Sequence, residues 1–149
     1  MLLPKLTVLF LCTGNSCRSQ MAEGWARKLR SDQWEPFSAG VEPAGLNPRA
    51  VHVMAESGVD ISLQRSKHVD ELAAARFDLV VTLCDSAREQ CPVPPRAKRV
   101  VHVGFDDPPE LARQARSEAE ALDSYRRVRD EIHSFIESLD PKNRRENHE

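Results

Sequence analysis

The stretch LTVLFLCTGNSCRSQMAEGWARKLR, residues 6–30, decides the fold of this 149-residue chain. Its first part, residues 6–11, is a nearly continuous apolar run, which is typical of a strand buried on both faces of a parallel sheet. Residues 19–30 carry apolar side chains at helical spacing among good helix formers. Residues 12–18 form a polar turn between these two parts. The stretch therefore predicts a strand, a tight loop and a helix.

The same order recurs along the rest of the chain. Asn47 and Pro48 are expected to open a helix that ends at Gly58, and a long apolar stripe predicts a last helix ended by Pro141. Strands that alternate with helices indicate an α/β fold. We expect a single-domain, open four-stranded parallel sheet with helices on both faces over residues 1–140, then a charged, disordered tail over 141–149. The other expected elements are strands at 34–39, 77–83 and 99–103 and a short helix at 66–75.

Composition excludes several classes of protein. The chain is 40% hydrophobic and 30% charged, and it has no apolar run near the roughly 20 residues that a membrane span needs. Its formal net charge is −2, with both signs interspersed, so a nucleic-acid partner is not expected. Four cysteines are too few for a disulfide scaffold, and the N-terminus has no signal cleavage pattern. We therefore expect a cytoplasmic protein with reduced thiols.

The loop after the first strand has the features of an anion-binding site. A loop that leads into a helix N-terminus offers free backbone N–H groups and the positive end of the helix dipole. Gly14 and Asn15 tolerate the positive φ that turns N–H groups inward, and the planar fork of Arg18 suits two oxygens of a tetrahedral oxyanion. The expected binding residues are Thr13, Gly14, Asn15, Ser16, Cys17, Arg18 and Ser19.

Cys12 lies at the base of this loop, where the helix dipole and Arg18 should lower its pKa and keep it a thiolate. A thiolate under a bound oxyanion is a nucleophile aimed at the central atom, and Ser19 is placed to hydrogen-bond that sulfur. The plainer alternative is a buried cysteine beside an unrelated arginine. Asp106 and Asp107 follow the last strand, and either could protonate a leaving oxygen or merely cap the next turn.

Two groups of residues carry a resemblance to a known family. The segments CTGNSCRSQMAEGW (12–25) and GFDDP (104–108) resemble the low-molecular-weight tyrosine phosphatase superfamily. Within it, LVVTLC (79–84) and the Cys91-Pro92 pair are similar to the thioredoxin-coupled arsenate reductases. By position, this resemblance implies Cys12 as nucleophile, Arg18 as oxyanion ligand and Asp107 as general acid. It implies Cys84 and Cys91 as relay thiols.

The resemblance also implies the reaction. Arsenate, with phosphate or sulfate as analogues, would bind in the loop and become attached to Cys12. Attack by Cys84 would release arsenite and leave a Cys12–Cys84 disulfide, and Cys91 would convert it to a Cys84–Cys91 disulfide for reduction by thioredoxin. No bound cofactor or metal is implied. If residues 84–91 are helical when reduced, they rise about 10 Å, which is too far for a disulfide, so we expect this segment to unwind on oxidation.

Alternatives to this reading remain open in the sequence. A phosphatase that acts on phosphomonoesters would use the same loop and acid but would leave Cys84 and Cys91 idle. Pro109 stands where such phosphatases place an aromatic side chain, which favours the reductase. A non-catalytic oxyanion binder would need neither acid nor relay. Zinc is not favoured by the cysteine spacing, and we expect a monomer in which Cys17 packs without a catalytic task.

One position departs from some reductases of the family. These hold a potassium ion with side chains that match Asn15, Glu23 and Ser38, together with an aspartate where this chain has Lys67. A lysine ammonium would repel the ion, and it could occupy the site by pairing with Glu23. We therefore expect no dependence on potassium.

Overall fold

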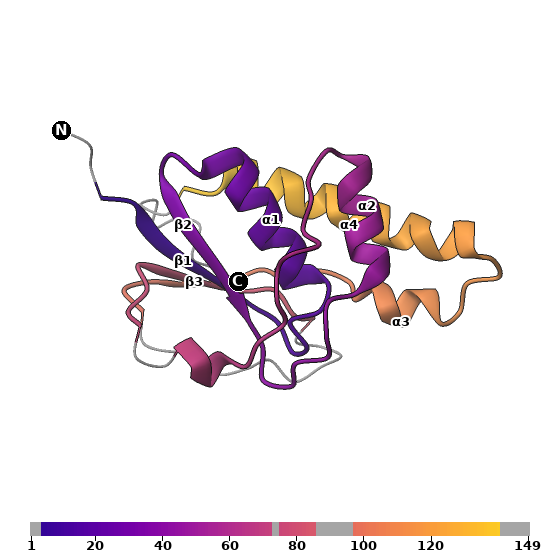
Figure 1. Cartoon of the computed structure of the whole chain (residues 1–149), viewed down its shortest axis with the longest axis horizontal. Helices are drawn as coiled ribbons and strands as arrows, with labels where there is room; N and C mark the ends of the chain where they lie inside the picture. Colours follow the sequence, from indigo (N-terminus) through magenta and orange to yellow (C-terminus); the bar gives the residue numbers. More distant parts are fainter. Residues whose placement is uncertain (1–3, 73–74, 86–96, 141–149) are drawn as a thin grey trace.

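A computed structural model of the chain, described over residues 4–72, 75–85 and 97–140, contains one sheet of parallel strands (Figure 1). The sheet order is β2-β1-β3-β4, with β1 at Leu6–Leu11, β2 at Trp34–Ala39, β3 at Leu79–Thr82 and β4 at Val100–His102. All three neighbouring pairs run parallel. The predicted four-stranded α/β sheet is therefore confirmed. Because the strands are parallel, their carboxyl ends open on one edge.

Three helices cover one face of the sheet: α1 (Arg18–Arg30), α2 (Pro48–Glu56) and α4 (Glu118–Ser138). Figure 1 shows them gathered on the upper side of the strands in that view. Val8 and Phe10 of β1 point into the main core that these helices close. This alternation of side chains is what a strand imposes. Buried helix residues in that core include Met21, Trp25, Met54, Val128, Ile132 and Ile136.

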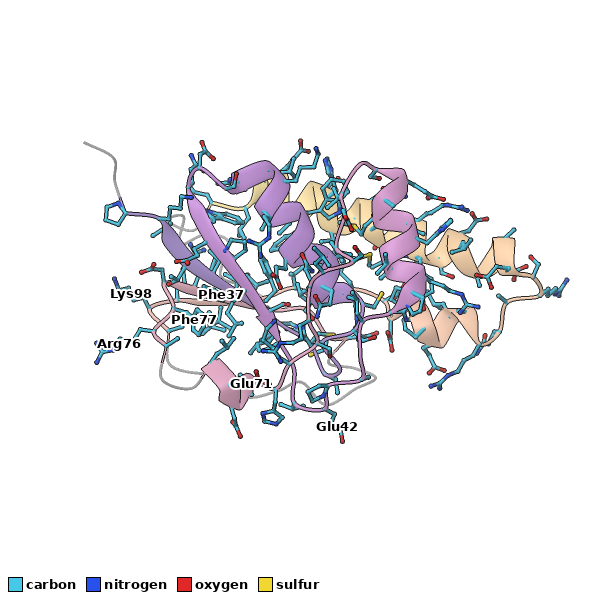
Figure 2. The ribbon with its side chains drawn as sticks, in the orientation of Figure 1. Phe37, Glu42, Glu71, Arg76, Phe77 and Lys98 are labelled. Carbon is cyan, nitrogen blue, oxygen red and sulfur yellow. The ribbon has the colours of Figure 1, made fainter. Side chains whose placement is uncertain are left out.

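The opposite face has a smaller core built on Leu9, Leu11 and Val80. The 3-10 helix η1 (Val69–Leu72) packs its apolar side chains there. Phe37 and Phe77 meet edge to face, with ring centroids 5.8 Å apart (Figure 2). Helical elements thus lie on both faces, although the described cover of this face is a single short turn.

Local signals set the ends of the helices. Asn47 caps α2 because its side-chain oxygen accepts hydrogen bonds from the N–H groups of Arg49 and Ala50, with Pro48 as the first helical residue. Gly58, just beyond the helix, has a φ of +79°. Ser117 caps α4 by accepting from the Glu120 N–H. The predicted start of α2 is confirmed, and the helix ends at Glu56, two residues before the expected Gly58.

Two elements differ from the sequence-based expectation. Of the short helix expected over residues 66–75, the described residues 66–72 form only η1, because this part is held to its neighbours by bonds such as Gly40 N–H to the Lys67 carbonyl instead of by a helical ladder. The five-residue helix α3 (Pro108–Ala112) was not predicted. The charged tail (141–149) and residues 86–91 lie outside the described residues. Within the part of the chain that the structure describes, no helix has both the length and the apolar character of a membrane span.

Candidate functional site

The loop after β1 joins the strand directly to the N-terminus of α1, as the sequence predicts. Cys17 is the residue that precedes the first turn of α1. Asn15 has a φ of 45°, which is the left-handed conformation that asparagine tolerates. Gly14 does not adopt a positive φ, so the expectation that its conformational freedom turns the loop was wrong. Asn15 alone makes that turn, because its side-chain hydrogen bonds offset the cost of the strained backbone.

The carbonyl groups of the loop are held outward by the segment that follows β2. The Thr13 oxygen accepts from the N–H groups of Val41 and Glu42, each at 2.9 Å, and the Gly14 oxygen accepts from Ala44 at 3.0 Å. The Ser16 oxygen accepts from Asn47 at 3.1 Å. In a trans peptide the N–H points opposite to the C=O. Anchoring these oxygens therefore turns the next N–H groups, those of Gly14, Asn15 and Cys17, the other way.

Asn15 is the centre of a buried hydrogen-bond network behind the loop. Its side-chain NH₂ donates to the Ser19 hydroxyl at 2.8 Å, and its side-chain oxygen accepts from the Lys67 N–H at 2.9 Å. Gln20 donates both to the Asn15 carbonyl at 3.0 Å and to its side-chain oxygen at 3.1 Å. Because the Ser19 oxygen accepts here, its own proton can be donated elsewhere. Ser19 thus keeps a hydrogen that it can donate to another group.

Arg18 and Asp107 face each other across the site. The Arg18 side chain is buried, with 4% of its surface exposed, and it donates from Nη1 to the Phe105 carbonyl at 3.0 Å. Its Nη2 lies 3.5 Å from Oδ1 of Asp107, whose side chain is 38% exposed. Asp107 directly precedes Pro108, the first residue of α3. A fixed guanidinium and a partly exposed carboxyl therefore border one space.

Asp106 points to a different part of the molecule. Its carboxylate accepts from Arg127 of α4 at 2.9 Å. The two candidates for the acid are thus separated by geometry, and Asp107 is the one that reaches the loop. The alternative in which these aspartates cap the following turn is not supported for Asp107, whose side chain makes no capping hydrogen bond to α3.

A cavity of about 360 Å³ brings most of the predicted site together. Cys12 lies on its wall with Arg18 and Asp107, and Glu42 and Pro109 lie on it as well. Figure 2 shows Glu42 on the loop after β2, at the lower end of the molecule in that view. Asn15 and Ser19, although predicted as binding residues, are fully buried and support the wall from behind. The remaining wall is formed by Thr13, Gly14, Ser16, Cys17, Ala44 and Asn47.

Cys17 is a buried free thiol that shares the cavity wall with Cys12. Burial raises its pKa well above the ordinary thiol value, although Arg18 opposes this shift; the nearby Cys12 and Asp107 raise it further. Iodoacetamide reacts with thiolates. We therefore expect brief treatment of the reduced protein at neutral pH to alkylate Cys12 in preference to Cys17, and phosphate to slow the reaction at Cys12. Peptide mass spectrometry measures both sites, and equal labelling of the two would contradict this.

The two cysteines that the resemblance assigns to a relay are only partly described. Cys84 is fully buried, follows β3 at the carboxyl edge of the sheet and is disulfide-bonded, whereas Cys12 and Cys17 are free. The Leu83 N–H donates to the Leu11 carbonyl at 2.9 Å, so the residues that follow these two, Cys84 and Cys12, leave neighbouring strands side by side. Cys91 and the expected helix before it lie outside the described residues.

Lys67 lies next to the hydrogen-bond network around Asn15. Its ammonium donates to the carbonyl oxygens of Ser38 and Arg65, at 2.9 and 3.0 Å. The expected direct pair with Glu23 is not formed, because the Glu23 carboxylate already accepts from Arg27 and Ser38. Burial lowers the pKa of Lys67, and the nearby Glu23 opposes that shift. Among the described residues, no cluster of three or more His, Cys, Asp or Glu side chains could hold a metal.

Sequence reasoning missed two residues that shape the loop. A Cβ on Gly40 would lie 2.6 Å from the Thr13 oxygen and 2.7 Å from the Cys12 oxygen, so only glycine fits there. Asn47 was recognised as a helix start, but its place in the cavity wall was not. Gly40 directly follows a predicted strand that neighbours β1, and this position was the available signal.

The fold and this cavity place Cys12, the loop that follows it and Arg18 around one space at the carboxyl end of a parallel strand, which is the arrangement predicted for an oxyanion site. A family model described as low molecular weight phosphotyrosine protein phosphatase matches residues 7–147. The chain belongs to this family.

Individual named proteins and solved structures are also similar to this chain. The arsenate reductase of Halalkalibacterium halodurans is 50% identical over 135 residues, covering 91% of this chain and 95% of that protein. The arsenate reductase of Bacillus licheniformis is 54% identical over 129 residues, covering 86% and 90%. A solved structure described as an arsenate reductase in the phosphate binding state matches with a TM-score of 0.75 at 31% identity, covering 90% of this chain and 95% of that one.

Proposed function

We propose that this protein is an enzyme that reduces arsenate to arsenite, with electrons supplied by thioredoxin, and that it does so as a monomer in the cytoplasm. The observation that carries the proposal is the cavity that joins Cys12, Arg18 and Asp107. Two relatives that are 50% and 54% identical are named arsenate reductase, which supports arsenate as the substrate. A thiol relay needs a compartment in which thiols are regenerated, which a reducing cytoplasm supplies.

The first step attaches arsenic to sulfur. The loop N–H groups and Arg18 hold the arsenate oxygens, and the positive helix end favours their negative charge. The Cys12 thiolate attacks arsenic and forms an As–S bond while one oxygen leaves as water, protonated by Asp107. Ser19, kept in place by Asn15, donates its proton toward the sulfur. Arsenic is still pentavalent after this step.

The second step transfers electrons. The Cys84 thiolate attacks the Cys12 sulfur, and the As–S electron pair goes to arsenic, which leaves as arsenite. A Cys12–Cys84 disulfide is formed, so two thiols have been oxidised and arsenic has gained two electrons. Cys91 then attacks Cys84, frees Cys12 and leaves a Cys84–Cys91 disulfide, which a thioredoxin dithiol reduces. The hydrogen bond from the Leu83 N–H to the Leu11 carbonyl supports the first exchange, because it brings Cys12 and Cys84 to the same edge of the sheet.

Single replacements of the cysteines by serine test this sequence of steps. With thioredoxin, thioredoxin reductase and NADPH, arsenate-dependent turnover is expected to vanish in Cys12→Ser, Cys84→Ser and Cys91→Ser. Cys17→Ser is the matched control and is expected to retain turnover. Without thioredoxin, Cys91→Ser should still release about one arsenite per enzyme, because the first exchange needs only Cys12 and Cys84.

Phosphomonoester hydrolysis separates the reductase from a phosphatase. Hydrolysis of an aryl phosphate should be lost in Cys12→Ser and retained in Cys84→Ser and Cys91→Ser. A wild-type protein that hydrolyses the ester rapidly but shows no arsenate-dependent NADPH oxidation would replace the reductase with the phosphatase. A protein that binds phosphate and catalyses neither reaction would be an oxyanion binder.

A lack of potassium dependence follows from Lys67. Its ammonium already supplies a positive charge beside Glu23 and Ser38, so a potassium ion does not fit there. We expect the melting temperature and the KM for arsenate to be the same in potassium and sodium chloride of equal ionic strength. A higher melting temperature or lower KM in potassium alone would contradict this. Lys67→Asp is the informative variant, since it should create such a dependence.

A further inference from the structure

Asn47, which caps α2, also anchors the loop over residues 12–18, the proposed oxyanion loop. The Asn47 N–H donates to the Ser16 carbonyl at 3.1 Å, which directs the N–H of Cys17 away from Asn47. The Asn47 side-chain oxygen caps α2, at 2.8 Å from the Arg49 N–H. Asn47 also lies on the cavity wall. One residue therefore fixes a helix end and one of the loop's peptide groups.

Tyr125 of α4 holds the side chain of Asn47 from the other side. The Asn47 NH₂ donates to the Tyr125 hydroxyl at 3.0 Å. The Tyr125 ring is 1% exposed and belongs to the main core. Burial raises its pKa, so the hydroxyl is neutral throughout the working range of pH. A rigid, buried acceptor thus fixes the orientation of the Asn47 amide.

Other contacts between α2 and α4 do not pass through the loop. Arg126 of α4 pairs with Glu56, the last residue of α2, at 2.7 Å between Nη2 and Oε2. This pair joins the same two helices as Tyr125 and Asn47, but it touches neither Ser16 nor the cavity wall. The chain therefore contains a matched comparison between general helix packing and the specific Tyr125–Asn47 contact.

We propose that Tyr125 and Asn47 are positioning residues that set the affinity of the loop for its oxyanion. The proposal rests on the proposed oxyanion site and goes beyond the reaction chemistry. Two hydrogen bonds connect Tyr125 to the loop. The first joins the Tyr125 hydroxyl to the Asn47 side-chain amide. The second joins the Asn47 N–H to the Ser16 carbonyl, whose peptide group carries the Cys17 N–H. When the hydroxyl is absent, Asn47 can rotate, and the Ser16 peptide loses its fixed orientation.

Phosphate binding, measured by calorimetry on the reduced protein, tests the proposal without any reductase assay. Tyr125→Phe removes one neutral hydrogen bond and is expected to weaken phosphate binding about three- to tenfold. The KM for arsenate should rise by the same factor while kcat changes less than about twofold, because phosphate and arsenate lose the same binding interaction. Asn47→Ser, which retains a good N-cap but cannot reach Tyr125, should weaken binding at least as much. The double variant should be no worse than Asn47→Ser alone.

Two controls separate positioning from stability. Arg126→Gln removes the ion pair with Glu56, one of several other links between α2 and α4, and Ser117→Ala removes the cap of α4; both are expected to lower the melting temperature with unchanged phosphate affinity. Unchanged phosphate affinity in Tyr125→Phe, or an equal loss in Arg126→Gln, would overturn the proposal. Arsenate turnover that is absent while phosphate binding still responds to Tyr125→Phe would overturn only the proposed function. A wild-type protein that binds no phosphate would overturn both.

Discussion

Gly40→Ala is expected to lower kcat/KM for arsenate at least about 100-fold, because a misplacement near 1 Å in a binding site costs on that order. The added methyl group would lie 2.6, 2.7 and 2.8 Å from three backbone atoms, the Thr13 and Cys12 oxygens and the Asn15 nitrogen. Backbone atoms cannot rotate out of the way as side chains do. The oxyanion loop must therefore move, and its N–H groups move with it. Steady-state kinetics with arsenate and calorimetry with phosphate measure the loss.

Gly24→Ala is the control for this substitution. A methyl group there would lie 2.6 Å from Cγ2 of Ile61 and 3.2 Å from Cε of Met54, so the overlap is equally tight but falls on side chains of the core. We expect a lower melting temperature with unchanged phosphate affinity. Gly14→Ala lies inside the loop and is expected to cost less than Gly40→Ala, since its nearest neighbour is Cβ of Ala44 at 3.5 Å. The reverse order would show that the loop is not held as described.

Asp107→Asn is expected to reduce the rate of arsenite release in a single turnover by about 10²- to 10⁴-fold, the usual contribution of a general acid. The amide keeps the shape of the side chain but has no proton to give to the leaving oxygen. Phosphate binding should be retained or become tighter, because a negative charge 3.5 Å from Nη2 of Arg18 is removed. Rapid quenching followed by quantification of arsenite measures the rate.

Asp106→Asn is the adjacent control for the acid. Asp106 binds Arg127 on the surface of α4, so its replacement should leave the single-turnover rate unchanged. Equal losses in both variants would show that the loop after β4 matters as a whole and that neither carboxyl acts as the acid. A loss confined to Asp106→Asn would show that Asp106, and not Asp107, is the general acid.

The sequence predicts the structure best where a local pattern of residues is compatible with only one local structure. The apolar run at Leu6–Leu11 predicts its strand with the observed ends, and Asn47-Pro48 predicts the start of α2. The choice of Asp107 over Asp106 as the acid came from a resemblance, and the geometry gave it a physical reason in the opposite directions of the two carboxylates. These features depend on neighbours in the sequence or on strand order.

The features that escaped prediction depend on contacts between distant segments. Nothing near Gly40 indicates that the backbone of residues 12–15 passes within contact distance. The hydrogen bond from Asn47 to Tyr125 joins residues 78 positions apart, and no periodicity reveals it. Gly14 was misjudged for a related reason: the loop needed one positive φ, and hydrogen bonds from remote residues such as Lys67 allow Asn15 to supply it.

The outward anchoring of the loop carbonyls has a consequence for competition inside a cell. A loop whose peptide groups are already fixed does not reshape itself around each ligand, so it recognises tetrahedral shape and negative charge rather than the identity of the central atom. Phosphate, which has the same shape and charge, is therefore expected to occupy the cavity and inhibit competitively. Discrimination would arise only afterwards, when sulfur bonded to arsenic can be displaced with transfer of an electron pair and sulfur bonded to phosphorus cannot. Selectivity would then belong to the electron-transfer step, and binding alone would provide almost none of it.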